Sequence, residues 1–556
     1  MSLRDEIAPL IQGDAVDDAE TLKKYSRDTS IFEVRPEVVV FPKNARDVSV
    51  IVTFVRAEKE KGRDISLTPR AAGTDMSGGP LTRSVSLVFT KYMNVLVSVD
   101  AEHLEATAEP GMYYHDFERE TLEKTGGILP PYPASREICA LGGMIADNAG
   151  GELTLKYGKM DRYVKELSVV LSDGSEATFA PISMQELAEK KLLQNLEGEI
   201  YRNIHALAEA NKEEVGAARP SVSKNSAGYA LWDVVNEKNG TFDITKLIVG
   251  SQGTLGIITK ARFELVRMKP HRAMLVIFLS DLAILPEVVR RVLKFDPEAF
   301  ESYDDHTFTL AVRFGWQFLE HLGLWKALAL GFAFLPEVWM TLTHGVPKLV
   351  LIAEFSEDSL EAARHKARDA YAEIRGLPVT ARLAFGKAES EKYWKIRRES
   401  FALLRKNMKG LHAAPFVDDI VVHPEDYPRF LPELSELLSH YNITYTIAGH
   451  IGNGNFHIIP LINLSRSEHR KAVLELTPRM YELVAKYKGS ITGEHNDGII
   501  RTPYLSLMFS PKMLVLFAEV KKIFDPLNIF NPGKKVGGTF EDIKRLMMHP
   551  AESETT

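Results

Sequence analysis

Hydrophobic residues recur every three to four positions in the segment ARDVSVIVTFVRAEKEKG, residues 45–62. This spacing is typical of an amphipathic helix with one buried face. The apolar positions are Val48, Ile51, Val52 and Val55. The run ISL at 65–67 follows and predicts a short strand. The chain therefore begins its first folded unit with a helix that leads into a strand.

After about residue 271 the pattern changes to short apolar runs that alternate with charged amphipathic segments. Strands are predicted at MLVIFL, LVLIAEF and DDIVVH, and a helix is predicted at SLEAARHKARDAYAEI, residues 359–374. Upstream, VKELSVVLSDGSEATF predicts two strands joined at Asp173-Gly174, a dipeptide that favours a hairpin turn. These patterns predict an α+β protein whose second domain begins near residue 271.

Three loops of small residues interrupt the first part of the chain. PRAAGTDMSGG (69–79) can expose several backbone N–H groups at once, which suits an anionic phosphate. The region 130–164 contains LGGMIADNAGG, whose glycines and alanines allow a large flat ligand to approach the backbone. The third, LIVGSQGTLGIITKARFELV (247–266), predicts a strand, a turn and a strand. None matches the Rossmann or P-loop pattern, so together they predict a different kind of cofactor cradle.

The stretch GHIGNGNFH, residues 449–457, places two histidines around glycines and asparagines. The flanking residues favour strands, so the stretch is predicted to be a hairpin with Gly452–Asn455 as its loop. In that register Ile451 pairs with Phe456 and His450 pairs with His457. Opposed side chains lie about 4.5–5.5 Å apart at Cβ and could bind one metal ion. Two structural histidines remain the alternative.

Composition excludes several classes of function. The 556 residues carry a net charge of −7, with 45% hydrophobic and 26% charged residues, as in ordinary globular proteins. No basic tract is present, which disfavours nucleic-acid binding. Cys139 is the only cysteine, so the chain alone can form neither an internal disulfide nor a cysteine-ligated iron–sulfur cluster, and we expect Cys139 to be packed in a core. The N-terminus lacks an apolar signal region, which predicts a cytoplasmic location.

One segment, GLWKALALGFAFLPEVWMTLTHG (323–345), is unusually apolar. Lys326, Pro336 and Glu337 interrupt it, so no run approaches the ~20 residues that a membrane span requires. A buried helical pair or substrate lid is one interpretation. Shallow docking on a membrane or a partner protein is the other.

The three loops and the two histidine motifs, GHIGNGNFH and TGEHNDGIIRTPYL (492–505), resemble those of the FAD-linked D-2-hydroxyacid dehydrogenases of the vanillyl-alcohol oxidase superfamily. The likeness extends over roughly residues 20–540. It implies a two-subdomain FAD-binding domain of the vanillyl-alcohol oxidase type, followed by an α+β substrate (cap) domain. The implied divisions are a helical segment at 1–34, the FAD-binding domain at 35–268, the cap domain with a closing flavin-contacting segment at 269–537, and a tail at 538–556.

The resemblance implies that the small-residue loops bind FAD without a covalent bond, because no histidine or cysteine tether is evident in them. Asn531 in the closing motif FDPLNIFNPGKK is placed near the flavin ring. The other residues assigned to the cofactor are Arg70, Ala71, Ala72, Gly73, Thr74, Asp75, Ser77, Gly78, Pro133, Ser135, Gly142, Gly143, Ala146, Asn148, Ala149, Gly150, Gly151, Gly253, Thr254, Gly256, Ile257 and Ile258.

In metal-dependent members of this family, residues matching His450, His457 and Glu494 hold a divalent cation, here Zn²⁺, Mn²⁺ or Fe²⁺. His495 would then be the base for the substrate hydroxyl. Arg397 in YWKIRRES would bind the substrate carboxylate, with Arg398 as its competitor. Family members often read EHG where this chain reads EHND.

The implied reaction is oxidation of a small D-2-hydroxy acid such as D-lactate. Val417 lies where hydroxyglutarate-type members use a lysine, which favours a short substrate. Electrons would pass to a separate acceptor: a quinone, a cytochrome, an electron-transfer flavoprotein or an iron–sulfur subunit. Peripheral membrane contact and a homodimer stay open. Three rival functions remain: a non-redox transferase such as alkyl-glycerone-phosphate synthase, a flavin-free metallohydrolase, and a non-catalytic flavoprotein subunit.

Overall fold

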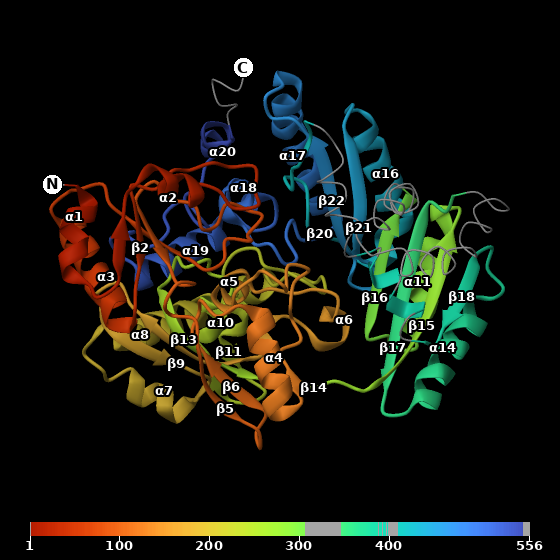
Figure 1. The fold of residues 1–556 in the computed structure, drawn as a ribbon, viewed down its shortest axis with the longest axis horizontal. Coiled ribbons are helices and arrows are strands. Elements are labelled where there is room, and N and C mark those ends of the chain that lie inside the picture. Colours follow the sequence, from red (N-terminus) through yellow and green to blue (C-terminus); the bar gives the residue numbers. More distant parts are fainter. Residues whose placement is uncertain are drawn as a thin grey trace, which may run out of the picture.

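Strands from the first 90 residues form the sheet that carries the first small-residue loop (Figure 1). The computed structural model describes residues 2–305, 346–386, 389–391, 393–395, 397 and 410–548. The sheet has the order β1-β2-β4-β3, in which β2, β4 and β3 run parallel to one another and β1 is antiparallel to β2. Its strands are β1 (Asp14–Val16), β2 (Val38–Phe41), β3 (Leu67–Arg70) and β4 (Val85–Val88).

Helix α3 (Ala45–Glu60) buries its apolar face in the core of this first sheet, and this confirms the predicted helix. Asn44 caps its N-terminus through a hydrogen bond from Asp47 N. The predicted strand at 65–67 begins only at Leu67, because the amide of Ile65 still bonds within the preceding turn, to Arg63 O. Strand β1 lies inside the segment that was predicted to be helical, alongside α1 (Leu3–Ile7) and α2 (Ala19–Lys24).

A second, antiparallel sheet has the order β5-β6-β13-β8-β9. Its strands are β5 (Leu96–Asp100), β6 (Glu105–Ala108), β8 (Val164–Val170), β9 (Glu176–Phe179) and β13 (Ile257–Glu264). The predicted hairpin is confirmed, with Gly174 at φ +84° in the turn between β8 and β9. The predicted strand before the 250–256 turn is wrong: helix α10 (Thr245–Ile248) lies there, because a short apolar run is equally compatible with a buried helix.

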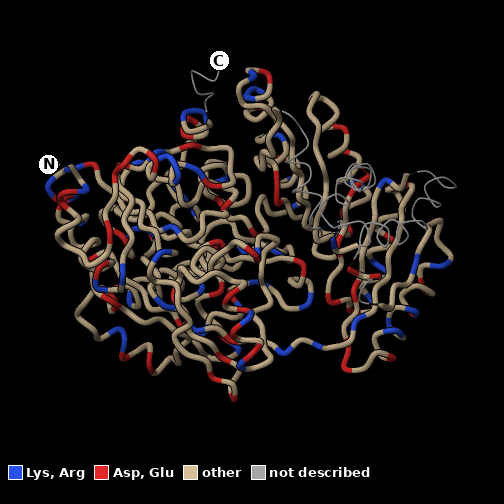
Figure 2. Tube along the Cα trace, viewed as in Figure 1, with Lys and Arg blue, Asp and Glu red and all other residues tan. Residues whose placement is uncertain are grey.

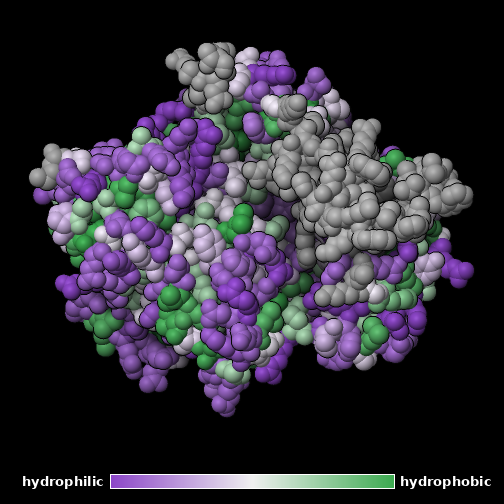
Figure 3. All heavy atoms as spheres, viewed as in Figure 1, coloured by the Kyte–Doolittle hydropathy of each residue, from purple (hydrophilic) through white to green (hydrophobic). Residues whose placement is uncertain are grey.

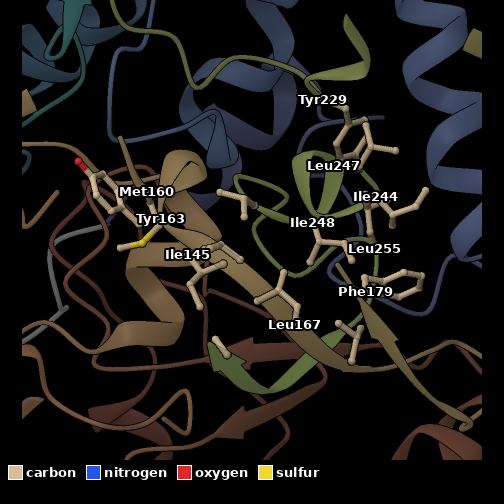
Figure 4. Close-up of a cluster of buried hydrophobic side chains, with 14 of the residues drawn as sticks. Ile145, Met160, Tyr163, Leu167, Phe179, Tyr229, Ile244, Leu247, Ile248 and Leu255 are labelled. Atoms are coloured by element: carbon tan, nitrogen blue, oxygen red, sulfur yellow. The ribbon is translucent and has the colours of Figure 1, made fainter. Parts of the chain in front are cut away.

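Buried side chains from segments far apart in the sequence fill the space between this sheet and its helices. Figure 4 shows Ile145 of α5 (Leu141–Asp147), Leu167 of β8 and Ile248 of α10 gathered in one cluster. The same core contains Phe517 and Phe524 of α19 (Pro511–Phe524), which packs against α8 (Leu196–Ala210). The chain therefore returns to its first domain after it has built the second one.

The second domain is built on one large sheet, seen at the right of Figure 1. Within the described residues its order is β18-β15-β17-β16-β21-β22-β19, and β20 also pairs with β22. The strands are β15 (His271–Leu279), β16 (Ala299–Asp304), β17 (Leu349–Glu357), β18 (Thr380–Ala384), β19 (His412–Ala413), β20 (Ile420–Val421), β21 (Thr444–His450) and β22 (Asn455–Ile462).

Helices α11 (Leu285–Leu293), α14 (Leu360–Ile374), α16 (Tyr427–Ser439) and α17 (Ser467–Lys486) contribute to the core of this domain. The predictions of α14, β15 and β17 are confirmed. The strand predicted at 418–423 shrinks to β20, because Asp419 has a positive φ of +67° that interrupts extended backbone.

The predicted register of the histidine hairpin is wrong. His450 pairs with Asn455 and Ala448 pairs with His457, because a 3₁₀ turn at Ile451–Asn453 ends at Gly454 with φ +74°, so the loop begins and ends one residue earlier than predicted. The two histidines are therefore diagonal neighbours rather than direct partners. They still share a face of the sheet, since residues two apart on a strand point to the same side. Their ring centroids lie 5.2 Å apart.

An extended link joins β14 (Val266–Arg267) to β15, and the C-terminal segment returns through α18 (Gly498–Arg501) and α19 to α20 (Phe540–Leu546). Helix α20 lies in the stretch that was predicted to be a tail. The apolar segment 323–345 lies outside the described residues. Among the described helices, none combines the length and the apolarity needed to cross a membrane.

Charged residues of both signs are interspersed along the trace in Figure 2. On the face drawn in Figure 3, hydrophilic residues dominate the coloured part, and hydrophobic residues form small separate patches.

Candidate functional site

A groove in the first domain is lined by the three small-residue loops. Asp147, Gln252, Gly79 and Pro110 also line it, although the sequence alone did not single them out. The residues assigned to the cofactor that line the groove are Arg70, Ala71, Ala72, Gly73, Thr74, Asp75, Gly142, Gly143, Ala146, Gly253, Gly256 and Ile258. Those that lie outside its lining are Ser77, Gly78, Pro133, Ser135, Asn148, Ala149, Gly150, Gly151, Thr254, Ile257 and Asn531.

The small residues are required where segments approach one another closely. A Cβ on Gly142 would lie 2.9 Å from Pro110 O, and a Cβ on Gly256 would lie 2.5 Å from Val169 Cγ1. Gly253 adopts φ +68° directly against Pro69, which an L side chain rarely tolerates. The groove therefore depends on these glycines for its shape as well as for ligand access.

Arg70 is the cation of the groove, and only 6% of its surface is exposed. Its guanidinium donates to Arg27 O at 2.7 Å and to Tyr25 O at 3.3 Å. Within the described part of the chain, Nε of Arg70 has no hydrogen-bond partner. An unsatisfied buried donor among small-residue loops fits a phosphate-bearing cofactor such as FAD.

Asn531 braces the groove from behind. Its amide donates to Gly79 O at 2.9 Å and to Gln252 O at 2.7 Å, and its Oδ1 accepts from Thr68 at 3.1 Å. The side chain is fully buried. Asn531 thus fixes two of the cofactor loops to strand β3, which is the role that the structure shows for it.

The second site is a convergence of His450, His457 and Glu494, all from the second half of the chain. Nε2 of His450 lies 3.4 Å from Glu494 Oε1, and Nε2 of His457 lies 3.8 Å from Glu494 Oε2. One ligand atom from each residue falls within 4.8 Å of the other two. This donor set fits a divalent cation, and it gathers the three residues predicted as metal ligands in one place.

Each of the two histidines uses its other nitrogen on a buried carboxylate. Nδ1 of His450 lies 2.6 Å from Glu301 Oε1, and Nδ1 of His457 lies 3.0 Å from Asp418 Oδ1. Such carboxylates orient the ring and leave Nε2 for a metal. Burial opposes ionisation of both acids, yet the neighbouring imidazoles hold the pKa of each carboxyl below its usual value. Glu301 and Asp418 were not predicted, because they are distant in sequence.

His495 approaches the other carboxylate oxygen of Asp418, with Nδ1 3.0 Å from Asp418 Oδ2. The angle of this contact is outside normal hydrogen-bond geometry. Its ring stacks on that of His457, with centroids 5.2 Å apart. Burial lowers the pKa of His495, but Asp419 and Asp418 outweigh it and raise the value to about 9. The pKa of His495 therefore departs from the ordinary value expected from the sequence.

Arg397 lies beside the metal-ligand set rather than apart from it. Its guanidinium is 3.2 Å from Glu301 Oε2, so Glu301 connects Arg397 to His450. The competitor Arg398 is outside the described residues. Val417 is fully buried, so a hydrophobic side chain occupies the position where a lysine was considered.

Lys224 is a further member of the site that sequence reasoning missed. Its ammonium lies 2.5 Å from Glu494 Oε1, and its side chain is 0% exposed. Burial would raise the pKa of Glu494, but Lys224 and the histidines hold it well below the usual range. The motif SVSKNSAGYA carries no metal-ligand spacing, so only the fold reveals this contact.

The two sites adjoin. A Cβ on Gly150, in the second cofactor loop, would lie 2.8 Å from Glu494 Oε1. Glu494 of the proposed metal-ligand set therefore lies directly beside the second cofactor loop.

Two family comparisons cover most of the chain. Residues 36–180 match the family described as FAD binding domain, and residues 268–535 match FAD linked oxidases, C-terminal domain. The chain belongs to the FAD-linked oxidase family. FAD as the cofactor is supported by the first match.

Three curated relatives illustrate the range of this FAD-linked oxidase family. D-2-hydroxyglutarate dehydrogenase of Escherichia coli (strain K12) is 26% identical over 92% of this chain and 49% of its own length. Glycolate oxidase subunit GlcD of Bacillus subtilis is 26% identical over 92% of this chain and 91% of its own. D-lactate dehydrogenase of Archaeoglobus fulgidus is 27% identical over 90% and 91%. The chain spans about half the length of several of the D-2-hydroxyglutarate dehydrogenases that it matches.

Solved structures share the fold of this FAD-linked oxidase. 4-Ethylphenol oxidase from Gulosibacter chungangensis has a TM-score of 0.67 at 17% identity and covers 97% of both chains. An alkyldihydroxyacetonephosphate synthase has a TM-score of 0.61 at 15% identity, covering 93% of this chain and 82% of its own. At these identities the likeness concerns the fold alone, and it supports the predicted α+β architecture with an FAD-binding domain of the vanillyl-alcohol oxidase type.

Proposed function

We propose that this FAD-linked oxidase is a dehydrogenase that converts a short D-2-hydroxy acid, such as D-lactate, into the 2-oxo acid. The observation that carries the proposal is the contact between Gly150 of a cofactor loop and Glu494 of the metal-ligand set. A hydroxy acid held at the metal ligands would lie against the flavin. The relatives named D-lactate dehydrogenase and D-2-hydroxyglutarate dehydrogenase support the substrate class.

FAD and a divalent cation both fit the residues that surround their proposed sites. The unpartnered Arg70 Nε and the small-residue lining suit FAD, and the converging donors of His450, His457 and Glu494 suit Zn²⁺, Mn²⁺ or Fe²⁺. When bound, FAD supplies a hydride acceptor and a divalent cation supplies a Lewis acid for the hydroxyl oxygen.

The chain's own residues would orient the substrate and remove one proton. We assign His495 as the base that takes the hydroxyl proton, with Asp418 and Asp419 stabilising the imidazolium that results. We assign Arg397 to the substrate carboxylate, where its planar guanidinium can form two parallel bonds. Glu301 holds Arg397 at 3.2 Å and so fixes the guanidinium near His450.

Val417 favours a short substrate. A distal carboxylate needs a compensating cation when it is desolvated. A fully buried valine cannot provide one. We therefore favour a lactate-like substrate over a hydroxyglutarate-like one.

The test is anaerobic flavin reduction with a panel of 2-hydroxy acids in both enantiomeric forms. We expect D-lactate or another short D-2-hydroxy acid to bleach the flavin and the L form to leave it oxidised. Equal bleaching by both enantiomers would refute the assigned geometry. A flavin that no 2-hydroxy acid reduces would instead favour a non-catalytic flavoprotein subunit, and a colourless protein would favour the flavin-free metallohydrolase.

The metal assignment has its own test. We expect chelation, or His457→Ala, to abolish substrate-dependent reduction while flavin stays bound, because the metal ligands and the groove come from different segments. Unchanged reduction after complete removal of metal would show that the two hairpin histidines are structural.

A further inference from the structure

Asn496 directly follows His495 and adopts φ +66°, in the left-handed region. Its side chain is fully buried. The amide nitrogen donates to Gly250 O at 2.8 Å, to Asp147 O at 3.2 Å and to Ala146 O at 3.3 Å. Ala146 and Asp147 line the cofactor groove, and Gly250 begins the turn that supplies Gln252 and Gly253 to it. One amide group thus contacts two separate cofactor loops.

The carbonyl oxygen of Asn496 is also used. It accepts from Lys535 Nζ at 2.6 Å and from Asp497 N at 2.7 Å. Asparagine tolerates the left-handed conformation better than most residues, and glycine tolerates it best. A glycine here would keep the backbone and lose all of these side-chain bonds.

Two buried lysines, Lys159 and Lys535, also bind the loop that bears Glu494 and His495, but they connect it to a different segment. Nζ of Lys159 binds Gly493 O and Asn225 O, and Nζ of Lys535 binds Asp497 Oδ2 and Ser226 O. These lysines join the loop to the 225–226 segment, which does not line the groove. Asn496 makes its bonds to the groove loops themselves.

We propose that Asn496 is a positioning residue that fixes the loop bearing Glu494 and His495 to the two cofactor loops. Its amide sets the distance between the base and the flavin, and it stabilises the groove in its flavin-binding form. The catalytic part of this inference rests on the proposed function. The cofactor part does not.

The experiment compares the flavin-loaded wild-type protein with three variants. Asn496→Gly keeps the backbone conformation and removes the amide. Asn496→Asp tolerates the same conformation and keeps an acceptor for Lys535, but it has no N–H to donate. Asn528→Gly is the matched control, because Asn528 also has a left-handed φ of +53° yet is exposed.

Two quantities are measured well below the unfolding temperature: the rate of flavin release, followed by fluorescence, and stopped-flow flavin reduction at several substrate concentrations. We expect both Asn496 variants to release flavin about tenfold faster, the effect of losing about one hydrogen bond's net energy. Their limiting reduction rate should fall at least about tenfold, since small misplacements of a base are costly. The apparent substrate Kd should change by less than about twofold, and Asn528→Gly should match the wild type.

If Asn496→Gly releases flavin and undergoes flavin reduction at the wild-type rates, the proposal is overturned. Asn496 would then be needed only because it adopts the left-handed backbone conformation. A lowered melting temperature with both rates unchanged would overturn it as well. Should Asn496→Gly fail to fold, Asn496→Asp decides the question. If no 2-hydroxy acid reduces the wild-type flavin, the proposed function fails, and the flavin-release comparison still tests the cofactor part.

Discussion

Replacing Lys224 by methionine tests the electrostatics of the metal-ligand set. Lys224 and Glu494 form a buried ion pair, with side chains 0% and 6% exposed and Nζ 2.5 Å from Oε1. Methionine keeps most of the side-chain volume and removes the ammonium. Without a metal, the variant leaves the Glu494 carboxylate buried beside the imidazoles of His450 and His457.

The magnitude follows from the burial of the pair. Removing one partner of a buried ion pair costs about 3–5 kcal/mol, because the remaining charge is uncompensated. The unfolding entropy is about 2.1 cal/mol/K per residue, so a chain of 556 residues that unfolds as one unit loses roughly 2–4 °C in Tm. A divalent cation bound to Glu494 would replace the ammonium as the compensating positive charge and would offset this loss of stability.

The assay is thermal unfolding of the flavin-loaded protein in chelator and in saturating Mn²⁺ or Zn²⁺. In chelator, Lys224→Met should melt roughly 2–4 °C below the wild type. Added metal should raise its Tm by more than it raises the wild-type Tm. The matched control is Lys521→Met, which breaks another buried pair, Lys521–Asp525 at 2.6 Å. This control should lower Tm equally in both conditions, because Lys521 does not contact the metal ligands.

Two outcomes would refute the reasoning. If Lys224→Met has the same Tm as the wild type in chelator, the ammonium does not stabilise Glu494. If metal raises the Tm of both proteins equally, Lys224 and the metal do not share the carboxylate as their partner.

The remaining predictions concern catalysis and the single cysteine. His495→Ala should slow flavin reduction by about 10²–10⁴-fold with little change in substrate binding, whereas Arg397→Ala should chiefly weaken substrate binding. Stopped-flow kinetics separates the two effects. A fully active His495→Ala variant would show that His495 is not the catalytic base. Flavin reduction should accelerate as pH rises through the pKa of His495, which Asp419 and Asp418 raise above its usual value, because the base must be deprotonated. Asp418→Asn should move this rise to lower pH, since the carboxylate raises that pKa; a rise that moves to higher pH would contradict the assignment. Burial raises the pKa of Cys139 to about 12, so a thiol reagent should label it only after unfolding. Rapid labelling of the folded protein would contradict this. The flavin should be released by acid or heat, and flavin that stays with the precipitated chain would show a covalent bond.

Several features of this protein could be predicted from the sequence because they are local. The periodicity of helices α3 and α14 and the Asp173-Gly174 turn depend on residues within about one or two turns of chain. The small-residue loops likewise indicate that a ligand or another segment approaches their backbone closely. His450 and His457 were recognised as candidate ligands in one short motif, and the family resemblance added Glu494; the structure brings all three together.

Other features depended on contacts between distant segments. The histidine register could not be predicted, because either position of the loop satisfies the local preferences and only the 3₁₀ turn at Ile451–Asn453 decides between them. The short apolar run at 247–249 is compatible with either a buried helix or a buried strand. The surrounding core therefore decided that helix α10 forms.

The polar groups that tune the site were the least predictable. Glu301, Asp418 and Lys224 lie between 39 and 270 positions from the metal-ligand residues that they contact. A lone Glu, Asp or Lys has no sequence signature, because its role depends on desolvation and on the charge that the fold places beside it. The sequence alone determined the ligand types and the loop chemistry. The tertiary structure decided which buried charges face one another, since Coulomb interactions depend on distance in space rather than separation along the chain.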